Sequence, residues 1–177
     1  MEGKNPENFI FIDESGANTD MTSEYARAEG GNRAKMPKPG CHWDHFSIIG
    51  AISIFGIVAL AYGKWATNAL TFLSFIKDFL LKKLRKGHVI FMDNVQFHKH
   101  SEVQKLIEST GAKLVFLPPY SPDFSPIEKM WSKIKHYLKK LKSWSSAEFH
   151  IALSSALMEL NDEDFEEWYD CCGYAMV

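Results

Sequence analysis

Residues 46–63 carry no charge over 18 consecutive positions, and this run constrains the fold more than any other feature of the sequence. Its length is at the lower limit for a helix that spans a membrane. However, Gly50, Gly56 and Gly63 interrupt it, and its many Ile, Val and Phe residues favour β-strands. Phe55 and Gly56 lie in the middle, where a tight turn would fall. We therefore predict a β-hairpin buried on both faces rather than a membrane segment.

Short apolar runs and helical patterns alternate on either side of this hairpin. Runs of four or five apolar residues that end at turn-forming residues predict buried strands. Apolar residues at three- and four-residue steps predict helices. We expect strands at 9–12, 88–92 and 113–117, an irregular insertion at 17–45, and helices at 69–86, 101–110, 126–141, 146–160 and 163–171. This order predicts an α/β domain with three antiparallel and two parallel strands in one mixed sheet flanked by helices.

Three helices carry further expectations about side chains. In the helix at 69–86, the apolar residues expected to face the core are Leu70, Leu73, Phe75, Ile76, Phe79, Leu80 and Leu84. In the helix that follows Ser125, those residues are Ile127, Met130, Trp131, Ile134, Leu138 and Leu141. The helix at 101–110 is expected to turn Val103, Leu106 and Ile107 inward.

The composition fits one globular domain. The chain has 177 residues, of which 46% are hydrophobic and 24% charged, and this excludes a disordered chain and a coiled coil. Its three cysteines exclude a disulfide scaffold and suit a reducing compartment. The sequence shows no signal peptide, so we expect a cytoplasmic protein.

The charge is unevenly distributed along the chain. Residues 143–177 contain eight acidic residues and no Lys or Arg. Residues 1–142 therefore hold 20 basic and 14 acidic residues, a net charge of +6, although the whole chain has a net charge of −2. A basic body favours a polyanionic partner, but two differently solvated surfaces would give the same pattern. The acidic segment either covers the basic surface or is a solvated end.

Three acids stand at the ends of predicted elements. Asp13 and Asp93 each follow a predicted strand, and Glu128 lies in the first turn of a predicted helix. Each has a structural interpretation, since Asp favours turns and Ser125-Pro126-Ile127-Glu128 fits a capping box. Taken together, the three carboxylates would converge at one edge of the sheet, where functional groups of α/β folds collect.

Such a cluster implies a bound cation. Crowded carboxylates repel one another unless a positive charge is present. Hard oxygen ligands suit Mg²⁺ or Mn²⁺, and two such ions assist phosphodiester cleavage. The basic body would then hold the nucleic-acid substrate.

Three sequence blocks resemble a known enzyme family. They are residues 11–16 (FIDESG), residues 92–94 (MDN) together with His98, and residues 117–128 (LPPYSPDFSPIE). These blocks resemble the catalytic motifs of mariner-like bacterial insertion-sequence transposases, which are DDE superfamily endonucleases with an RNase H-like fold. The 34 residues between Asp93 and Glu128 agree with that family's spacing. The family usually has Asn where this chain has Ser125.

The resemblance implies a catalytic mechanism and partners. Asp13, Asp93 and Glu128 would form the catalytic triad and hold two Mg²⁺ or Mn²⁺ ions. The enzyme would cleave DNA at the ends of an insertion sequence and transfer the strand to target DNA. It would act as a homo-oligomer and, when bound to DNA, associate with the bacterial nucleoid.

The resemblance also predicts how the chain is organised. We expect one catalytic domain over residues 1–177, with an RNase H-like core at 9–142 and an acidic helical segment at 143–177. Family members normally begin with helix-turn-helix modules, and only about ten residues precede the first predicted strand. We therefore expect the helix-turn-helix domain to be absent here, and a separate helix-turn-helix chain to be a possible partner.

A lysine-rich helix follows the third acid. Residues 129–142 contain six lysines and no acidic residue, which next to a phosphodiester site favours contact with the DNA backbone over a merely solvated face. His98 either approaches the site or begins the next helix. The residues that we predict to bind DNA are Lys129, Lys133, Lys135, Lys139, Asn94, His98 and Tyr120.

Two other functions remain open from the sequence. The chain could be a metal-dependent nuclease that cleaves without integration. It could also be an inactive remnant of a transposase that serves only as a binding module. The presence of all three acids favours an enzyme.

Overall fold

A computed structural model describes residues 5–22, 30, 43–94, 101–119, 121–142 and 145–174. Five strands form one sheet in the order β3-β2-β1-β4-β5. The pairs β1–β2 and β2–β3 are antiparallel, and the pairs β1–β4 and β4–β5 are parallel. The predicted mixed sheet is therefore confirmed. The strands are β1 (Phe9–Asn18), β2 (His45–Ser53), β3 (Gly56–Gly63), β4 (Val89–Met92) and β5 (Lys113–Phe116).

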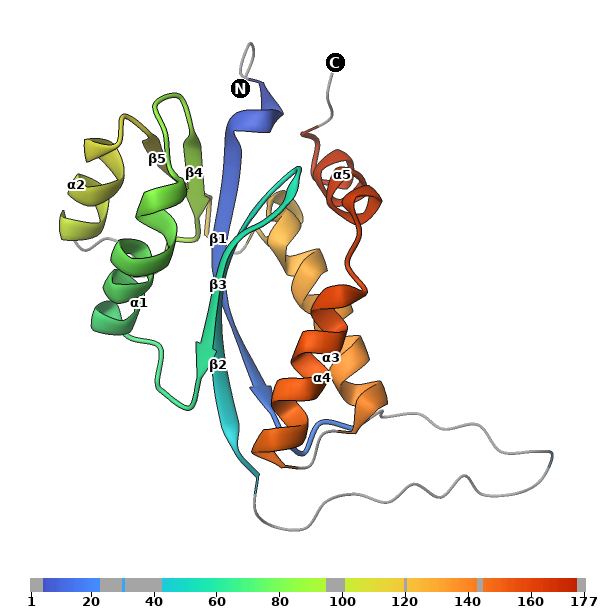
Figure 1. Ribbon diagram of the computed structural model, residues 1–177. Helices are drawn as coiled ribbons and strands as arrows, with labels where there is room; N and C mark the ends of the chain where they lie inside the picture. Colours follow the sequence, from blue (N-terminus) through green and yellow to red (C-terminus); the bar gives the residue numbers. More distant parts are fainter. Residues whose placement is uncertain are drawn as a thin grey trace.

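Helices cover both faces of this sheet (Figure 1). One face carries α1 and α2, and the other carries α3, α4 and α5. The helices are α1 (Ala69–Phe75), α2 (Ser101–Ser109), α3 (Pro126–Leu141), α4 (Ser146–Met158) and α5 (Asp162–Cys171). None of the helices in the described part of the chain is long and apolar enough to cross a membrane.

The two helical layers explain why the strands are apolar at successive positions. Successive side chains of a strand point to opposite faces. Phe9 and Phe11 enter the core beneath α3, α4 and α5, whereas Ile10 and Ile12 enter the core beneath α1 and α2. A strand covered on both faces needs apolar residues throughout.

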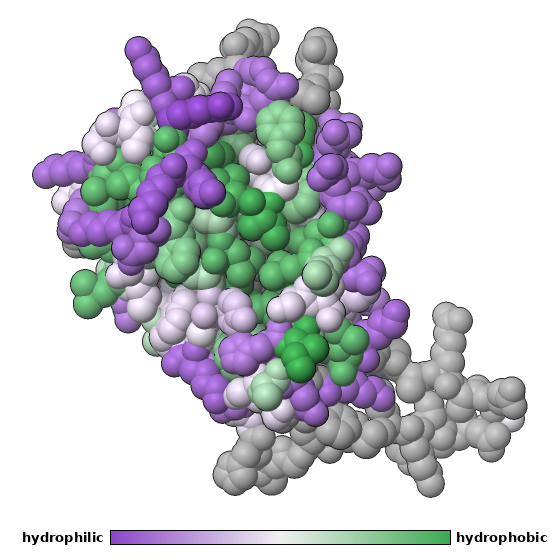
Figure 2. All heavy atoms as spheres, viewed as in Figure 1, coloured by the Kyte–Doolittle hydropathy of each residue, from purple (hydrophilic) through white to green (hydrophobic). Residues whose placement is uncertain are grey.

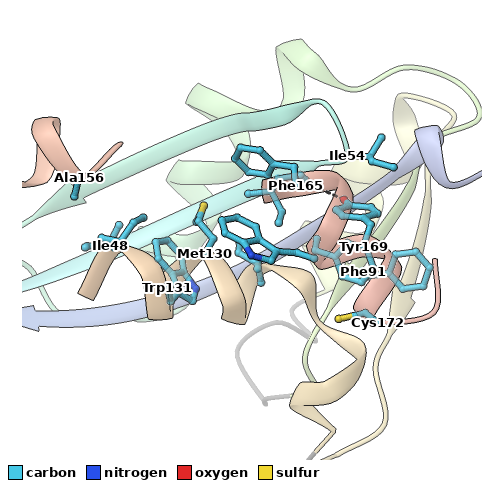
Figure 3. Packing of buried hydrophobic residues seen from close by; sticks show 14 of the residues in the cluster. Ile48, Ile54, Phe91, Met130, Trp131, Ala156, Phe165, Tyr169 and Cys172 are labelled. Carbon is cyan, nitrogen blue, oxygen red and sulfur yellow. Dashed lines mark hydrogen bonds between the residues drawn. The ribbon is translucent and has the colours of Figure 1, made fainter. Parts of the chain in front are cut away.

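The C-terminal helix α5 is anchored in the larger core. Figure 3 shows Phe165 and Tyr169 of α5, and Cys172 directly after it, directed into the same cluster as Met130 and Trp131 of α3. The hydroxyl of the fully buried Tyr169 lies 3.1 Å from the carbonyl oxygen of Phe9 and 3.2 Å from that of Ile52. The acidic segment is therefore built into the domain.

The strand β3 forms one edge of the sheet. Figure 2 shows apolar side chains gathered on the side of the molecule where this edge lies, between the two helical layers. Most of β3 is only half-buried, and at the hairpin turn the Phe55 side chain is 62% exposed. The predicted burial of the hairpin on both faces thus holds for β2 and only in part for β3.

Strand β1 is longer than predicted. We expected it to stop at Asp13, but it runs on to Asn18. The reason is its second neighbour. β2 pairs with β1 from Phe11 to Asn18 and supplies hydrogen-bonding partners beyond the point where β4 ends. Asp13 therefore lies within a strand rather than in a turn.

The first long helix is shorter and less regular than predicted. It was expected over 69–86, but α1 ends at Phe75 and continues as a π turn, Ile76–Leu80, and a 3₁₀ turn, Leu81–Lys83. The change of helical pitch rotates the apolar face, so Phe75, Ile76 and Leu80 are buried while Phe79 is 49% exposed. Leu70 in α1 and Leu141 in α3 were also expected to be buried, and both are exposed.

Candidate active site

Two of the predicted acids lie where the pairing of β1 with β4 ends. The last residue pair of that parallel ladder is Ile12 with Met92, so Asp13 and Asp93 follow it directly on neighbouring strands. Phe11 and Phe91 lie two positions before these acids, and their side chains are directed toward α3. Because side chains alternate along a strand, Asp13 and Asp93 are directed the same way. The register of β1 and β4 therefore brings the two carboxylates to the same place.

The third acid comes from the first turn of α3. Ser125 precedes the helix and Pro126 begins it, as predicted. The predicted capping box is wrong, because the Ser125 side chain makes no capping hydrogen bond. The Glu128 backbone N–H instead donates to the Ser125 carbonyl oxygen at 3.1 Å, which satisfies that donor without a side chain. Ser125 is buried, whereas Glu128 is exposed and available to the site.

All three carboxylates line one cavity of about 360 Å³. Asn94 lines it as well, and Pro118, Pro119 and Pro122 form part of its wall. Proline fixes its own backbone φ angle, so this part of the wall is conformationally restricted. Residues far apart in the sequence thus form one cavity, with acidic groups in its lining, at the carboxyl end of β4.

The surroundings of Asp13 favour its neutral form. Burial, and after it the negative charges of Glu14, Glu128 and Asp93, together raise the pKa of Asp13 to about 7, against a hydrogen bond from the Glu14 backbone that lowers it. The Oδ1 atom of Asp93 is also buried. A carboxyl group whose pKa is raised by neighbouring carboxylates is typical of a site that binds a cation or a proton.

Trp131 adds a hydrogen bond that sequence analysis missed. Its indole Nε1–H donates to Asp13 Oδ2 at 3.0 Å. The helical pattern correctly predicted that Trp131 is buried, and it is 2% exposed. Its polar partner lies 118 positions away in the sequence, and the only available signal was that a buried indole N–H needs an acceptor.

The donor set fits a hard divalent cation. Asp13, Asp93 and Glu128 supply only carboxylate oxygens, the ligand type that Mg²⁺ and Mn²⁺ favour. The structure brings these groups to one cavity, but no three His, Cys, Asp or Glu side chains in the described part of the chain are already placed to hold a metal ion.

The lysines of α3 lie on two different sides of the helix. A helix advances about 100° per residue, so Lys135 and Lys139 lie on the same side as Glu128. Lys129 and Lys133 lie on a neighbouring side. Lys129 is exposed, and Lys135 and Lys139 are half-buried. The cationic groups closest in direction to the cavity are therefore those of Lys135 and Lys139.

Lys133 has a structural partner. Its ammonium nitrogen lies 2.6 Å from Asp164 Oδ2 and 2.7 Å from Asp164 Oδ1, in a pair that is mostly buried. Burial alone would raise the pKa of Asp164, but the hydrogen bonds from Lys133 and the Asn161 backbone and the charge of Lys133 hold it below its usual range. The acidic segment therefore covers this part of the basic helix, which was one of the two interpretations of its charge.

The loop beside the cavity is held by the C-terminal segment. The Tyr174 hydroxyl donates to the carbonyl oxygen of Phe124 at 2.9 Å, just before α3 begins. The Tyr174 ring packs against Phe9, Phe11 and Phe91 in the core. Of the other predicted DNA-binding residues, His98 and Tyr120 lie outside the described residues.

Comparison with known proteins gives one family. Residues 8–149 match the family described as DDE superfamily endonuclease. Comparison with curated proteins finds no match.

Solved structures share the fold. A Mos1 strand transfer complex matches with a TM-score of 0.73 and 16% identity, covering 95% of this chain and 55% of that chain. A Mos1 mariner paired-end complex with Mn matches with a TM-score of 0.73 and 16% identity, covering 94% and 55%. The catalytic domain of Mos1 mariner transposase matches with a TM-score of 0.66 and 15% identity, covering 94% and 81%. The chain thus spans about half the length of the first two proteins.

Proposed function

Because the chain belongs to the DDE superfamily endonucleases, we propose that it cleaves DNA with divalent metal ions held by Asp13, Asp93 and Glu128. One observation carries this proposal. Three carboxylates from β1, from the end of β4 and from the first turn of α3 line the same cavity, and burial together with the nearby acidic residues raises the pKa of Asp13 to about 7. An acidic site of this kind is suited to a cation and unsuited to a bare phosphodiester.

Each acid has a defined task in this proposal. When bound, a pair of Mg²⁺ or Mn²⁺ ions activates the attacking oxygen and stabilises the leaving oxygen of the phosphodiester. Asp13, whose pKa is raised to about 7, would hold the cations in its deprotonated form. Asp93 would hold them from the end of the neighbouring strand, and Glu128 from the first turn of α3.

We further propose that the reaction is transposition. Water would first free a 3′-hydroxyl at the end of an insertion sequence, and that hydroxyl would then attack target DNA. The sequence blocks resemble those of mariner-like transposases, and the structural neighbours include a strand transfer complex and a paired-end complex of Mos1. Paired ends in those structures support action as a homo-oligomer.

DNA would lie along the cavity side of α3. Lys135 and Lys139 share the direction of Glu128 on the helix, Lys129 follows Glu128 in the sequence, and Asn94 lines the cavity. Backbone phosphates bind Lys side chains without regard to base sequence. Contact by Lys133 would first require its pair with Asp164 to open. His98 and Tyr120 remain in the proposal on the resemblance alone.

Thermal unfolding with and without Mn²⁺ tests the proposal. A ligand that binds only the folded state stabilises it by mass action, so millimolar Mn²⁺ should raise the melting temperature. Asp93→Asn should reduce that rise, because it removes an anionic ligand and keeps the side-chain shape. The matched control is Asp78→Asn, an exposed acid on the opposite face of the sheet. An equal rise in both variants, or no rise in the wild type, would count against the metal site.

A further inference from the structure

We propose that Trp131 is a positioning residue for Asp13, an inference that rests on the proposed metal-dependent function. The indole Nε1–H donates to Asp13 Oδ2 at 3.0 Å. Together with the hydrogen bond from the Glu14 backbone, it restricts how the carboxyl group, which lines the cavity, can rotate. Partners of this kind orient metal ligands in many proteins.

The surroundings of Trp131 make it a rigid donor. The side chain is 2% exposed and packs in the core between α3 and the sheet (Figure 3). A buried aromatic ring in a dense core has few alternative rotamers. The nitrogen is therefore held at a fixed place relative to β1, which an exposed Ser or Asn could not achieve.

Gly50 provides the space that this arrangement requires. It pairs with Asp13 across the β1–β2 ladder, so the two residues lie side by side. A Cβ atom at this position would lie 2.8 Å from Trp131 Cη2 and 3.1 Å from Cζ2. Any residue larger than glycine would push the indole away from the strand that carries Asp13. In the sequence, Gly50 was only an interruption of the uncharged run. In the structure, the Trp131 indole ring lies against Gly50, where a side chain would otherwise be.

The same hydrogen bond also sets the position of the third acid. Trp131 follows Glu128 by three residues on α3, so both lie within one helical turn. When Nε1 binds Asp13, the first turns of α3 are fixed relative to β1, and the separation between Asp13 and Glu128 is fixed with them. One contact therefore positions two of the three proposed metal ligands.

The test compares two tryptophan substitutions in the same core cluster. Trp131→Phe removes the N–H donor, and Trp168→Phe removes a comparable buried indole that has no contact with Asp13 in the described structure. Mn²⁺ affinity is measured by calorimetry on folded protein. Loss of an orienting partner typically weakens metal binding about 10- to 100-fold, so Trp131→Phe should weaken it by at least about tenfold. Trp168→Phe should leave it unchanged.

A third variant separates the hydrogen bond from packing. Benzothienylalanine incorporated at position 131 keeps the shape of the ring and replaces N–H with sulfur. It should keep the stability of the wild type and still bind Mn²⁺ about tenfold more weakly.

In the metal-free wild type, the Trp131 indole proton should resonate downfield in a ¹H–¹⁵N spectrum and move upfield in Asp13→Ala.

The outcomes distinguish this inference from the proposed function. If the wild type binds no Mn²⁺, the proposed function fails, and the positioning role fails with it. If the wild type binds Mn²⁺ and the benzothienylalanine chain binds it equally tightly, the positioning role alone is wrong. An indole resonance that does not respond to Asp13→Ala would also overturn it.

Discussion

At the scale of single residues, Asp13 has conflicting requirements. Burial within the strand and the nearby charges of Glu14, Glu128 and Asp93 favour its neutral form. In its proposed role as a metal ligand it must be charged. Trp131 partly resolves this conflict, because a hydrogen bond to a carboxylate favours the charged form. The site is thus built at some expense of stability, as is common where function needs buried charge.

This conflict predicts a pH dependence of stability in metal-free protein. The pKa of Asp13 is raised to about 7 in the folded state from 3.8, so between these pH values the folded state binds more protons than the unfolded state. Stability should therefore fall as pH rises from about 4 to about 7, by up to roughly 1.4 kcal/mol per pH unit from this group. Asp13→Asn should remove this component. Urea denaturation at several pH values measures it, and identical slopes in both proteins would contradict the raised pKa.

The contact of Gly50 with Trp131 gives a second residue-scale prediction. Gly50→Ala should destabilise the fold by about 1–3 kcal/mol, because overpacking a dense core forces side chains to shift. In a Trp131→Phe background the clashing ring atoms are absent, and the cost should be smaller by about 1 kcal/mol. Chemical denaturation of the four proteins gives this coupling. Additive effects would show that the two residues do not constrain each other.

At the scale of elements, α3 has separate sides for separate roles. Its buried side holds the sheet, one side carries Glu128, Lys135 and Lys139, and a third carries Lys133, which pairs with α5. The sequence showed only that the helix is rich in lysine. It could not show that Lys133 has an acidic partner, because Asp164 lies 31 positions away.

These two groups of lysines should respond differently to substitution. Replacing Lys135 and Lys139 by Gln should weaken DNA binding and reduce the slope of log affinity against log salt by roughly 2, since each phosphate contact contributes about 0.9. Lys133→Gln should instead cost about 1–3 kcal/mol of stability, because it leaves the Asp164 carboxylate without its charged partner. Fluorescence anisotropy at several salt concentrations and urea denaturation measure the two effects. If Lys133→Gln reduced the salt slope and the Lys135/Lys139 double variant left it unchanged, the DNA contact would belong to Lys133 instead.

At the scale of the whole molecule, much of the fold could be predicted from the sequence. Apolar runs and turn residues predicted all five strands and their pairing directions, because local patterns and connection rules restrict the topology. The extension of β1 past Asp13 and the exposure of Phe79 could not be predicted, because they depend on a neighbouring strand and on helical pitch. The three acids could be placed near one another from strand order. The Trp131 hydrogen bond, the unused capping box and the Lys133 pair depend on contacts between distant segments.

The C-terminal segment should be essential for the fold. Tyr169 and Tyr174 cover Phe9, Phe11 and Phe91 and bind backbone carbonyl groups of β1, β2 and the loop before α3. Deletion of residues 162–177 should expose this core and abolish the cooperative unfolding transition. Near-ultraviolet circular dichroism during urea denaturation measures that transition. A truncated chain that unfolds as cooperatively as the whole chain would show that the segment is an appendage.

Mn²⁺-dependent cleavage of a labelled DNA duplex tests the central claim most directly. The substitution is Glu128→Gln, which removes the charge of the third acid, and the matched control is Glu163→Gln on an exposed part of α5. Neither side chain caps a helix, so both variants should be as stable as the wild type within about 0.5 kcal/mol. The wild type and Glu163→Gln should cleave the duplex only when Mn²⁺ is present, and Glu128→Gln should not cleave it, since a neutral amide is a poor ligand for a hard dication. Cleavage by Glu128→Gln at the wild-type rate, or cleavage by any of the three without a divalent metal, would contradict the account.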